Sequence, residues 1–146
     1  MPVFGYMFGR LHIAVDRGSR SKSYKALVRA REKLESGTSV LIYPEGTIPD
    51  KTKVDMLRFK DGAFKLAIES QIPLAPMTVV GAHRALLDNG KWLLRPARIK
   101  VIFHDPIETK GMTLEDIPTL RKRVFDQNME TLREYNGLIP VPATSV

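Results

Sequence analysis

The sequence predicts an α/β fold in which a largely parallel sheet is flanked by helices. Short apolar runs at residues 11–15, 39–43 and 74–80 have the length and composition of strands. Between them, residues 24–34 and 62–68 show the three-to-four-residue spacing of amphipathic helices. Because strand and helix patterns alternate along the chain, consecutive strands are expected to pair in parallel through helical crossovers.

The first helix and the strand that follows it have clear signals in the sequence. The helix pattern sets an apolar face against a cationic one, and Gly37 stands where a helix commonly ends in a residue with positive φ. Residues 39–43 follow as a strand that is expected to be buried. The apolar face is predicted to consist of Tyr24, Leu27, Val28 and Leu34, and the cationic face of Lys25, Arg29 and Lys33.

The second half of the chain continues with strands and one long helix. Residues 74–80 are apolar on both faces, which predicts an interior strand. Residues 98–103 alternate basic with apolar side chains and predict a strand with one solvated face. Residues 113–135 hold the last helix, and the length of the chain predicts one domain at residues 1–137 with a tail at 138–146. The core stripe of this helix is predicted to be Leu120, Val124, Phe125, Met129 and Leu132.

The composition limits the class of protein. The chain has 43% hydrophobic and 27% charged residues, which is ordinary for a globular domain, and it has no cysteine for disulfides or thiolate chemistry. No apolar run reaches the roughly 18 residues of a membrane span, and no secretory signal is recognisable, so a cytoplasmic location is expected. The net charge of +7 favours an anionic partner, which leaves phosphorylated small molecules, acidic lipid surfaces and nucleic acid open.

Polar side chains follow three of the predicted strands. Arg17 comes after the first strand, Glu45, Gly46 and Thr47 after the second, and His83 after the third. Because the carboxyl ends of parallel strands meet at one edge of a sheet, where open α/β folds bind ligands, these groups are expected to converge. Gly46 permits a sharp turn or a close approach to a substrate. An ordinary strand-to-loop turn with a solvated glutamate stays open as the alternative.

Four segments of the sequence carry a resemblance to a known family. Residues 15–17 (Val-Asp-Arg), 44–47 (Pro-Glu-Gly-Thr) and 72–76 (Ile-Pro-Leu-Ala-Pro) resemble, in order and spacing, three of the four sequence blocks of the 1-acylglycerol-3-phosphate acyltransferases. Residues 59–64 (Phe-Lys-Asp-Gly-Ala-Phe) resemble the segment that joins the third and fourth blocks. The resemblance spans residues 1–137 and implies a glycerol-3-phosphate acyltransferase-like α/β fold.

The resemblance also implies roles for the matched residues. Arg17 matches the arginine of the second block, which helps to bind the phosphate of the acceptor, a task that suits a planar guanidinium. Glu45 and Gly46 match residues that shape the acceptor site, and Thr47 matches the hydroxyl of the same block. Lys60 lies where a cation could meet the phosphate, although a solvated surface lysine is the plain alternative.

The sequence departs from the family pattern at two points. The third block normally ends in arginine, and Ile48 occupies that position, which puts the acceptor head group in doubt. The first block, a histidine followed after four residues by an aspartate, should precede residue 15 by some tens of residues, so the chain is expected to be an N-terminally truncated form with at most trace turnover. His83 and Asp88 have the same spacing but follow the fourth block, so they are not expected to stand in for this catalytic pair.

The function implied by the resemblance is acyl transfer in phospholipid synthesis. A fatty acyl group would pass from acyl-CoA or acyl carrier protein to lysophosphatidic acid and give phosphatidic acid. Beyond this co-substrate no cofactor is implied, and no residue cluster has the spacing of a metal site. Because the acceptor is a lipid, the chain is expected to bind an anionic membrane surface peripherally, on the inner face.

Two other functions stay open at this stage. The first is a noncatalytic module that binds phosphate or anionic lipid, which would show no acyl transfer. The second is a basic nucleic-acid-binding domain, which is disfavoured because aromatic and basic residues are not interleaved in the sequence.

Overall fold

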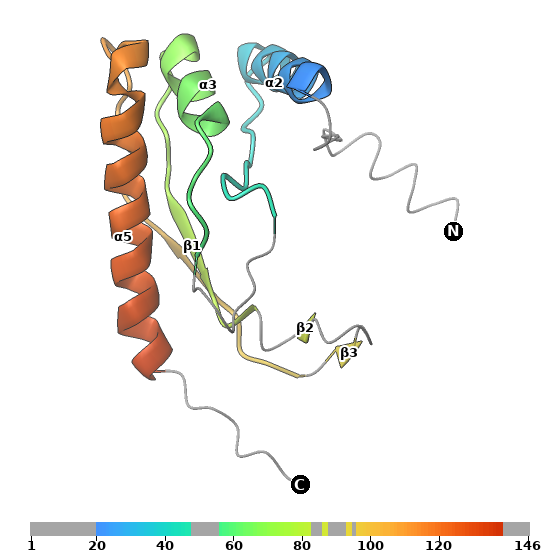
Figure 1. Cartoon of the computed structure of the whole chain (residues 1–146), viewed down its shortest axis with the longest axis vertical. Helices are drawn as coiled ribbons and strands as arrows, with labels where there is room; N and C mark the ends of the chain where they lie inside the picture. The colour runs from blue at the N-terminus through green and yellow to red at the C-terminus, as the bar shows by residue number, and fades with distance from the viewer. Residues whose placement is uncertain (1–19, 48–55, 83–85, 88–92, 95, 139–146) are drawn as a thin grey trace, which may run out of the picture.

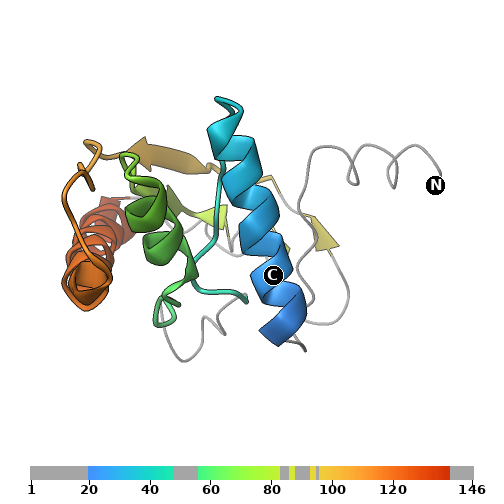
Figure 2. The same cartoon turned by 90° about the horizontal axis from the view of Figure 1, so that it is seen from above.

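The structure is a computed structural model that describes residues 20–47, 56–82, 86–87, 93–94 and 96–138 (Figure 1). The elements are α2 (Arg20–Glu35), α3 (Gly62–Ser70), β1 (Met77–Val80), β2 (Leu86–Leu87), β3 (Leu93–Leu94), β4 (Lys100–Phe103), η1 (Leu114–Asp116) and α5 (Ile117–Leu138). Figures 1 and 2 show α5, α3 and α2 in a row, with α3 in the middle and α2 running nearly across the direction of α5.

The three predicted helices are confirmed, and the end of α2 shows the expected glycine stop. Gly37 has a φ of 81°, a left-handed conformation that glycine adopts without a steric penalty. Its N–H donates to the carbonyl of Leu34 at 2.9 Å, and the N–H of Thr38 donates to that of Lys33 at 2.9 Å. These bonds satisfy carbonyls that the helix leaves unpaired at its C-terminus.

The apolar face predicted for α2 is partly wrong. Tyr24 and Val28 are 64% and 41% exposed, whereas Ala26 and Ala30 are buried. Leu27 would lie 3.6 Å from a Cβ added at Gly62 of α3. Tyr24 and Val28 line a shallow groove with Lys65, Leu66 and Glu69 of α3. The helix therefore meets α3 through Leu27, while Tyr24 and Val28 stay exposed at the edge of this contact.

The largely parallel sheet is not confirmed, because every strand pairing in the described part of the chain is antiparallel. β1 pairs with β4, with Met77 opposite Phe103, and β2 pairs with β3. Of the first two predicted strands, residues 11–15 lie outside the described residues and residues 39–43 form no strand. An extended segment becomes a strand only when a neighbouring backbone supplies a hydrogen-bond ladder, and the described residues supply none here.

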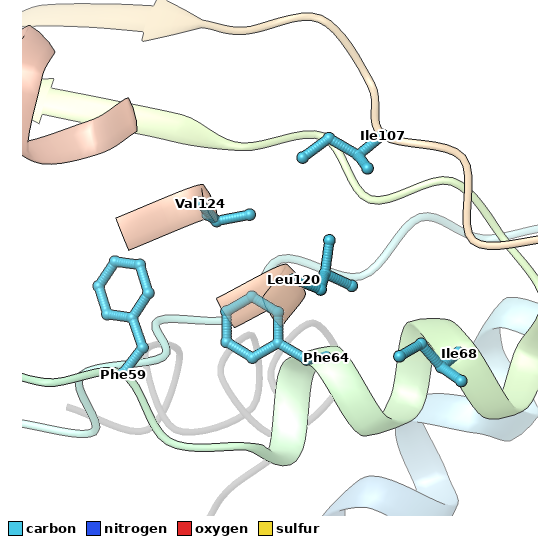
Figure 3. Packing of buried hydrophobic residues seen from close by; sticks show 6 residues of the cluster. All are labelled: Phe59, Phe64, Ile68, Ile107, Leu120 and Val124. Carbon is cyan, nitrogen blue, oxygen red and sulfur yellow. The ribbon is translucent and has the colours of Figure 1, made fainter. Parts of the chain in front are cut away.

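The core joins α3, α5 and the chain beyond β4 (Figure 3). It consists of Phe59, Phe64, Ile68, Ile107, Leu120 and Val124. Phe59 stacks on Phe64 with ring centroids 6.3 Å apart and meets the edge of Phe125 at 5.2 Å. Aromatic pairs at these separations add to the hydrophobic burial. The predicted α5 stripe is confirmed for Leu120 and Val124, which lie in this cluster.

Polar contacts close the end of α3. The hydroxyl of Thr109, which is fully buried, donates to the carbonyls of Ala67 at 3.1 Å and Ile72 at 2.6 Å. Gln71 ends the helix in the left-handed region, at a φ of 51°, and its side-chain Oε1 accepts from the N–H of Gly111 at 2.6 Å. The loop after β4 therefore supplies partners that the helix terminus lacks.

Among the helices of the described residues, none has the length and apolarity that crossing a bilayer would require. The longest, α5, has 22 residues and carries exposed charged side chains such as Lys122 and Asp126.

Replacing Phe64 with alanine is expected to lower the free energy of unfolding by about 3–5 kcal/mol, because its side chain is 1% exposed and the core would hold a cavity. The matched control is Phe103→Ala, the same change at a side chain that is 75% exposed, with an expected cost of about 1 kcal/mol or less. Urea denaturation followed by circular dichroism measures both. Equal losses would show that the cluster around Phe64 is not the core.

Candidate functional site

The Tyr-Pro-Glu-Gly segment at residues 43–46 forms a tight turn. The N–H of Gly46 donates to the carbonyl of Tyr43 at 3.3 Å, which closes the turn. Proline at the second position and glycine at the fourth are both favoured in turns, because proline fixes φ and glycine tolerates a wide range of φ. Gly46 has a φ of 71°, so the turn relies on its glycine.

Residues 57–60 lie against this turn and are fixed to it by two hydrogen bonds. The N–H of Lys60 donates to the carbonyl of Pro44 at 2.8 Å. The N–H of Leu57 donates to Oε2 of Glu45 at 2.6 Å, so the half-buried carboxylate holds a backbone segment twelve residues away. Sequence reasoning missed this role of Leu57, because a backbone N–H leaves no signal in residue type or spacing.

The side chain of Lys60 lies over Gly46. A Cβ added at Gly46 would come within 2.8 Å of Nζ, 2.9 Å of Cε and 3.2 Å of Cδ of Lys60. A side chain at position 46 would therefore displace the lysine. Within residues 20–47, 56–82 and 96–138 no carboxylate forms an ion pair with Lys60, so its ammonium is exposed and uncompensated beside the turn.

The structure thus brings together Glu45, Gly46 and Lys60 of the predicted site residues. Thr47 follows them at an exposed bend. Arg17, His83 and Asp88 lie outside the described residues, so the predicted convergence of three strand ends stays a prediction. The described arrangement offers a cation with free N–H donors, and such a group suits a phosphate or carboxylate ligand.

His104 has a structural role. Its Nε2 lies 2.9 Å from the hydroxyl oxygen of Thr78, and its backbone N–H donates to the carbonyl of Pro76 at 3.0 Å. These contacts tie the end of β4 to β1. No group of three or more His, Cys, Asp or Glu side chains in the described part of the chain is placed to hold a metal ion.

Comparison with known proteins places these residues in a family. The family model described as Acyltransferase matches residues 1–80, which include the turn at residues 43–46 and Lys60. The chain belongs to this family. The resemblance of the sequence blocks to the acyltransferases is therefore confirmed.

Curated relatives within the family carry a more specific name. The chain is 31% identical over 127 residues to a 1-acyl-sn-glycerol-3-phosphate acyltransferase of Limnanthes alba, covering 86% of this chain and 44% of the relative. It is 33% identical over 115 residues to the beta form of the enzyme from Homo sapiens, covering 79% of this chain and 40% of the relative. The chain thus spans less than half the length of these relatives.

A solved structure agrees with the fold. The crystal structure of the 1-acyl-sn-glycerophosphate (LPA) acyltransferase PlsC from Thermotoga maritima matches with a TM-score of 0.66 at 29% identity. The match covers 79% of this chain and 46% of that chain. The described helices and strands therefore share an acyltransferase fold.

Glu45→Ala is expected to speed hydrogen exchange at the amide of Leu57 by about tenfold or more, because the N–H loses a charged acceptor. Glu45→Gln keeps an amide oxygen that can accept the bond and should have a smaller effect. Exchange monitored by NMR measures both variants, and Glu108→Ala, a change at an exposed carboxylate, is the control. Unchanged exchange in Glu45→Ala would contradict the proposed link between the two segments.

Proposed function

We propose that this chain forms part of an acyltransferase that moves a fatty acyl group to lysophosphatidic acid. The observation that carries the proposal is the match of residues 1–80 to the Acyltransferase family, together with relatives named as 1-acyl-sn-glycerol-3-phosphate acyltransferases. In the reaction the free hydroxyl oxygen of the acceptor forms a bond to the thioester carbonyl carbon. The carbon–sulfur bond breaks, the thiol leaves with the hydroxyl proton, and phosphatidic acid results.

The proposed donor is a thioester, either acyl-CoA or an acylated acyl carrier protein, and both remain candidates for this chain. No further cofactor is invoked. The proposed acceptor is a lipid, so the chain would work at the cytoplasmic face of an anionic membrane as a peripheral protein.

The turn at residues 43–46 and Lys60 would form part of the acceptor site. Glu45 holds residues 57–60 in place through Leu57, and Gly46 leaves room for the lysine side chain. The uncompensated ammonium of Lys60 would then donate to the acceptor phosphate, and Arg17 would add a second cation as it does in the family pattern. Ile48 offers no charge at the position where the family has arginine. Lys60 would therefore contribute a larger share of the affinity for the acceptor phosphate.

Direct binding and transfer measurements test the proposal. Lysophosphatidic acid should bind more tightly than lysophosphatidylcholine, whose phosphate is masked by choline. Radiolabelled acyl-CoA and acylated acyl carrier protein, each tested in turn with this protein, would show the donor. A protein that binds lysophosphatidic acid and transfers nothing from either donor would instead be the noncatalytic lipid-binding module.

Lys60→Met is expected to weaken lysophosphatidic acid binding by about tenfold, because one charge-assisted hydrogen bond to phosphate is lost while the aliphatic chain is kept. Lys60→Arg should retain most of the affinity. Isothermal titration calorimetry measures the dissociation constants, and Lys110→Met, at an exposed lysine of the turn before Gly111, is the control. If Lys60→Met binds as the parent does, the ammonium does not contact the acceptor.

Arg17→Ala is expected to weaken lysophosphatidic acid binding by on the order of tenfold or more, because a guanidinium can donate two hydrogen bonds to a phosphate. Ile48→Arg should strengthen binding by restoring the cation of the family pattern. Titrations with lysophosphatidic acid and inorganic phosphate measure both variants, with circular dichroism as the check on folding. If the Arg17→Ala protein stays folded and keeps its affinity, Arg17 does not contribute to binding the acceptor.

A further inference from the structure

The outward side of α2 carries a row of cations that have no partner in the described part of the chain. Lys25, Arg29 and Lys33 follow one another at intervals of four residues, which places them on one side of the helix. All three are exposed, and none forms an ion pair with a described carboxylate. Like charges at this spacing repel one another and destabilise a helix. The repulsion between these cations therefore lowers the stability of α2, and a bound anionic partner would reduce this repulsion.

Several other surface cations of the described helices are paired. Arg31 pairs with Glu35 at 2.9 Å, Lys65 pairs with Glu69 at 3.6 Å, and Lys122 pairs with Asp126. Each of these pairs joins residues four apart on the same helix. Arg123 and Arg133 of α5 are exposed and, like the α2 cations, form no ion pair with a described carboxylate, but they stand apart from each other in the sequence. Among the described helices, α2 alone carries a row of such cations at intervals of four residues.

Apolar side chains border the cation row. Val28 lies three residues after Lys25, so the two are neighbours on the helix surface, and Tyr24 lies one turn before Val28. Tyr24 and Val28 are 64% and 41% exposed, at the edge of α2 that lies beside Lys65, Leu66 and Glu69 of α3. Figure 2 shows α2 at the end of the row of helices that lies away from α5, and Ala26 and Ala30 of this helix are buried. A tyrosine and a valine beside cations match the interface of a bilayer, where phosphates lie next to the upper acyl chains.

We infer that this side of α2 binds the surface of an anionic membrane. The cations would contact lipid phosphates, while Tyr24 and Val28 would reach the boundary between head groups and acyl chains. The inference rests on the proposed function, because a lipid acceptor must be taken from a membrane. Glu32 lies among these residues three positions after Arg29, and its carboxylate opposes the attraction.

The test measures binding to vesicles made of equal parts phosphatidylglycerol and phosphatidylcholine. Each cation near such a surface contributes about fivefold in affinity, so the triple variant Lys25→Gln, Arg29→Gln, Lys33→Gln should bind on the order of 100-fold more weakly. Glutamine is a good helix former, so α2 should persist, and circular dichroism checks this. Glu32→Gln should strengthen binding. Rising salt should weaken binding by the parent chain, because ions screen exposed charges.

The matched control is the triple variant Lys110→Gln, Lys122→Gln, Arg123→Gln, which removes the same charge from exposed positions outside α2 and should keep its affinity for the vesicles. Equal binding by parent and α2 variant, or equal binding of the parent to pure phosphatidylcholine vesicles, would overturn the inference. Binding of acyl carrier protein through α2 with no binding to vesicles would also overturn it.

A separate titration with soluble short-chain lysophosphatidic acid distinguishes this inference from the proposed function. The α2 variant should bind that ligand as the parent does, because the acceptor site lies at residues 43–46 and 60. Failure of the parent to bind it would count against the proposed function, whereas the vesicle result would still decide the role of α2.

Discussion

The burial of Phe59 is the constraint on which the described site depends. This side chain is 4% exposed and contacts Phe64 on α3 and Phe125 on α5. Its neighbours in the chain, Leu57 and Lys60, donate their backbone N–H groups to the turn at residues 43–46. The hydrophobic core therefore fixes the position of a polar segment that lies at the surface. Because aromatic packing is shape-specific, the segment has little freedom to move relative to the helices.

The same region shows how one glycine serves both conformation and space. Gly46 adopts a positive φ, and its missing Cβ leaves room for the aliphatic part of Lys60. Two contacts therefore set the direction of the Lys60 side chain: the hydrogen bond from its backbone N–H to Pro44, and the packing of the side chain over Gly46. A long side chain on an open surface samples many rotamers. Because Lys60 is already ordered, binding a ligand costs less conformational entropy.

Charge is distributed unevenly over the described helices. Lys65 on α3 and Lys122 on α5 pair with carboxylates four residues away, whereas one side of α2 keeps three cations unpaired. The site beside Gly46 likewise holds an unpaired ammonium. Within the described residues, unpaired positive charge thus stands at two places that each suit a phosphate: one on the acceptor and one on the membrane that would supply it.

The sequence alone determined the local features of this protein. Periodicity placed the three helices, Gly37 predicted the end of α2, and short blocks such as Glu45-Gly46-Thr47 identified the family before any contact was known. Only the tertiary structure decided which side chains are covered and which backbones pair. Ala26 and Ala30 of α2 are buried, whereas Tyr24 and Val28 remain exposed at the edge of the contact between α2 and α3. Residues 39–43 lack a described ladder partner, and the pairing of β1 with β4 is antiparallel. Side-chain burial and strand pairing depend on segments that are far apart in the chain, whereas sequence periodicity reflects only residues that are close in the sequence.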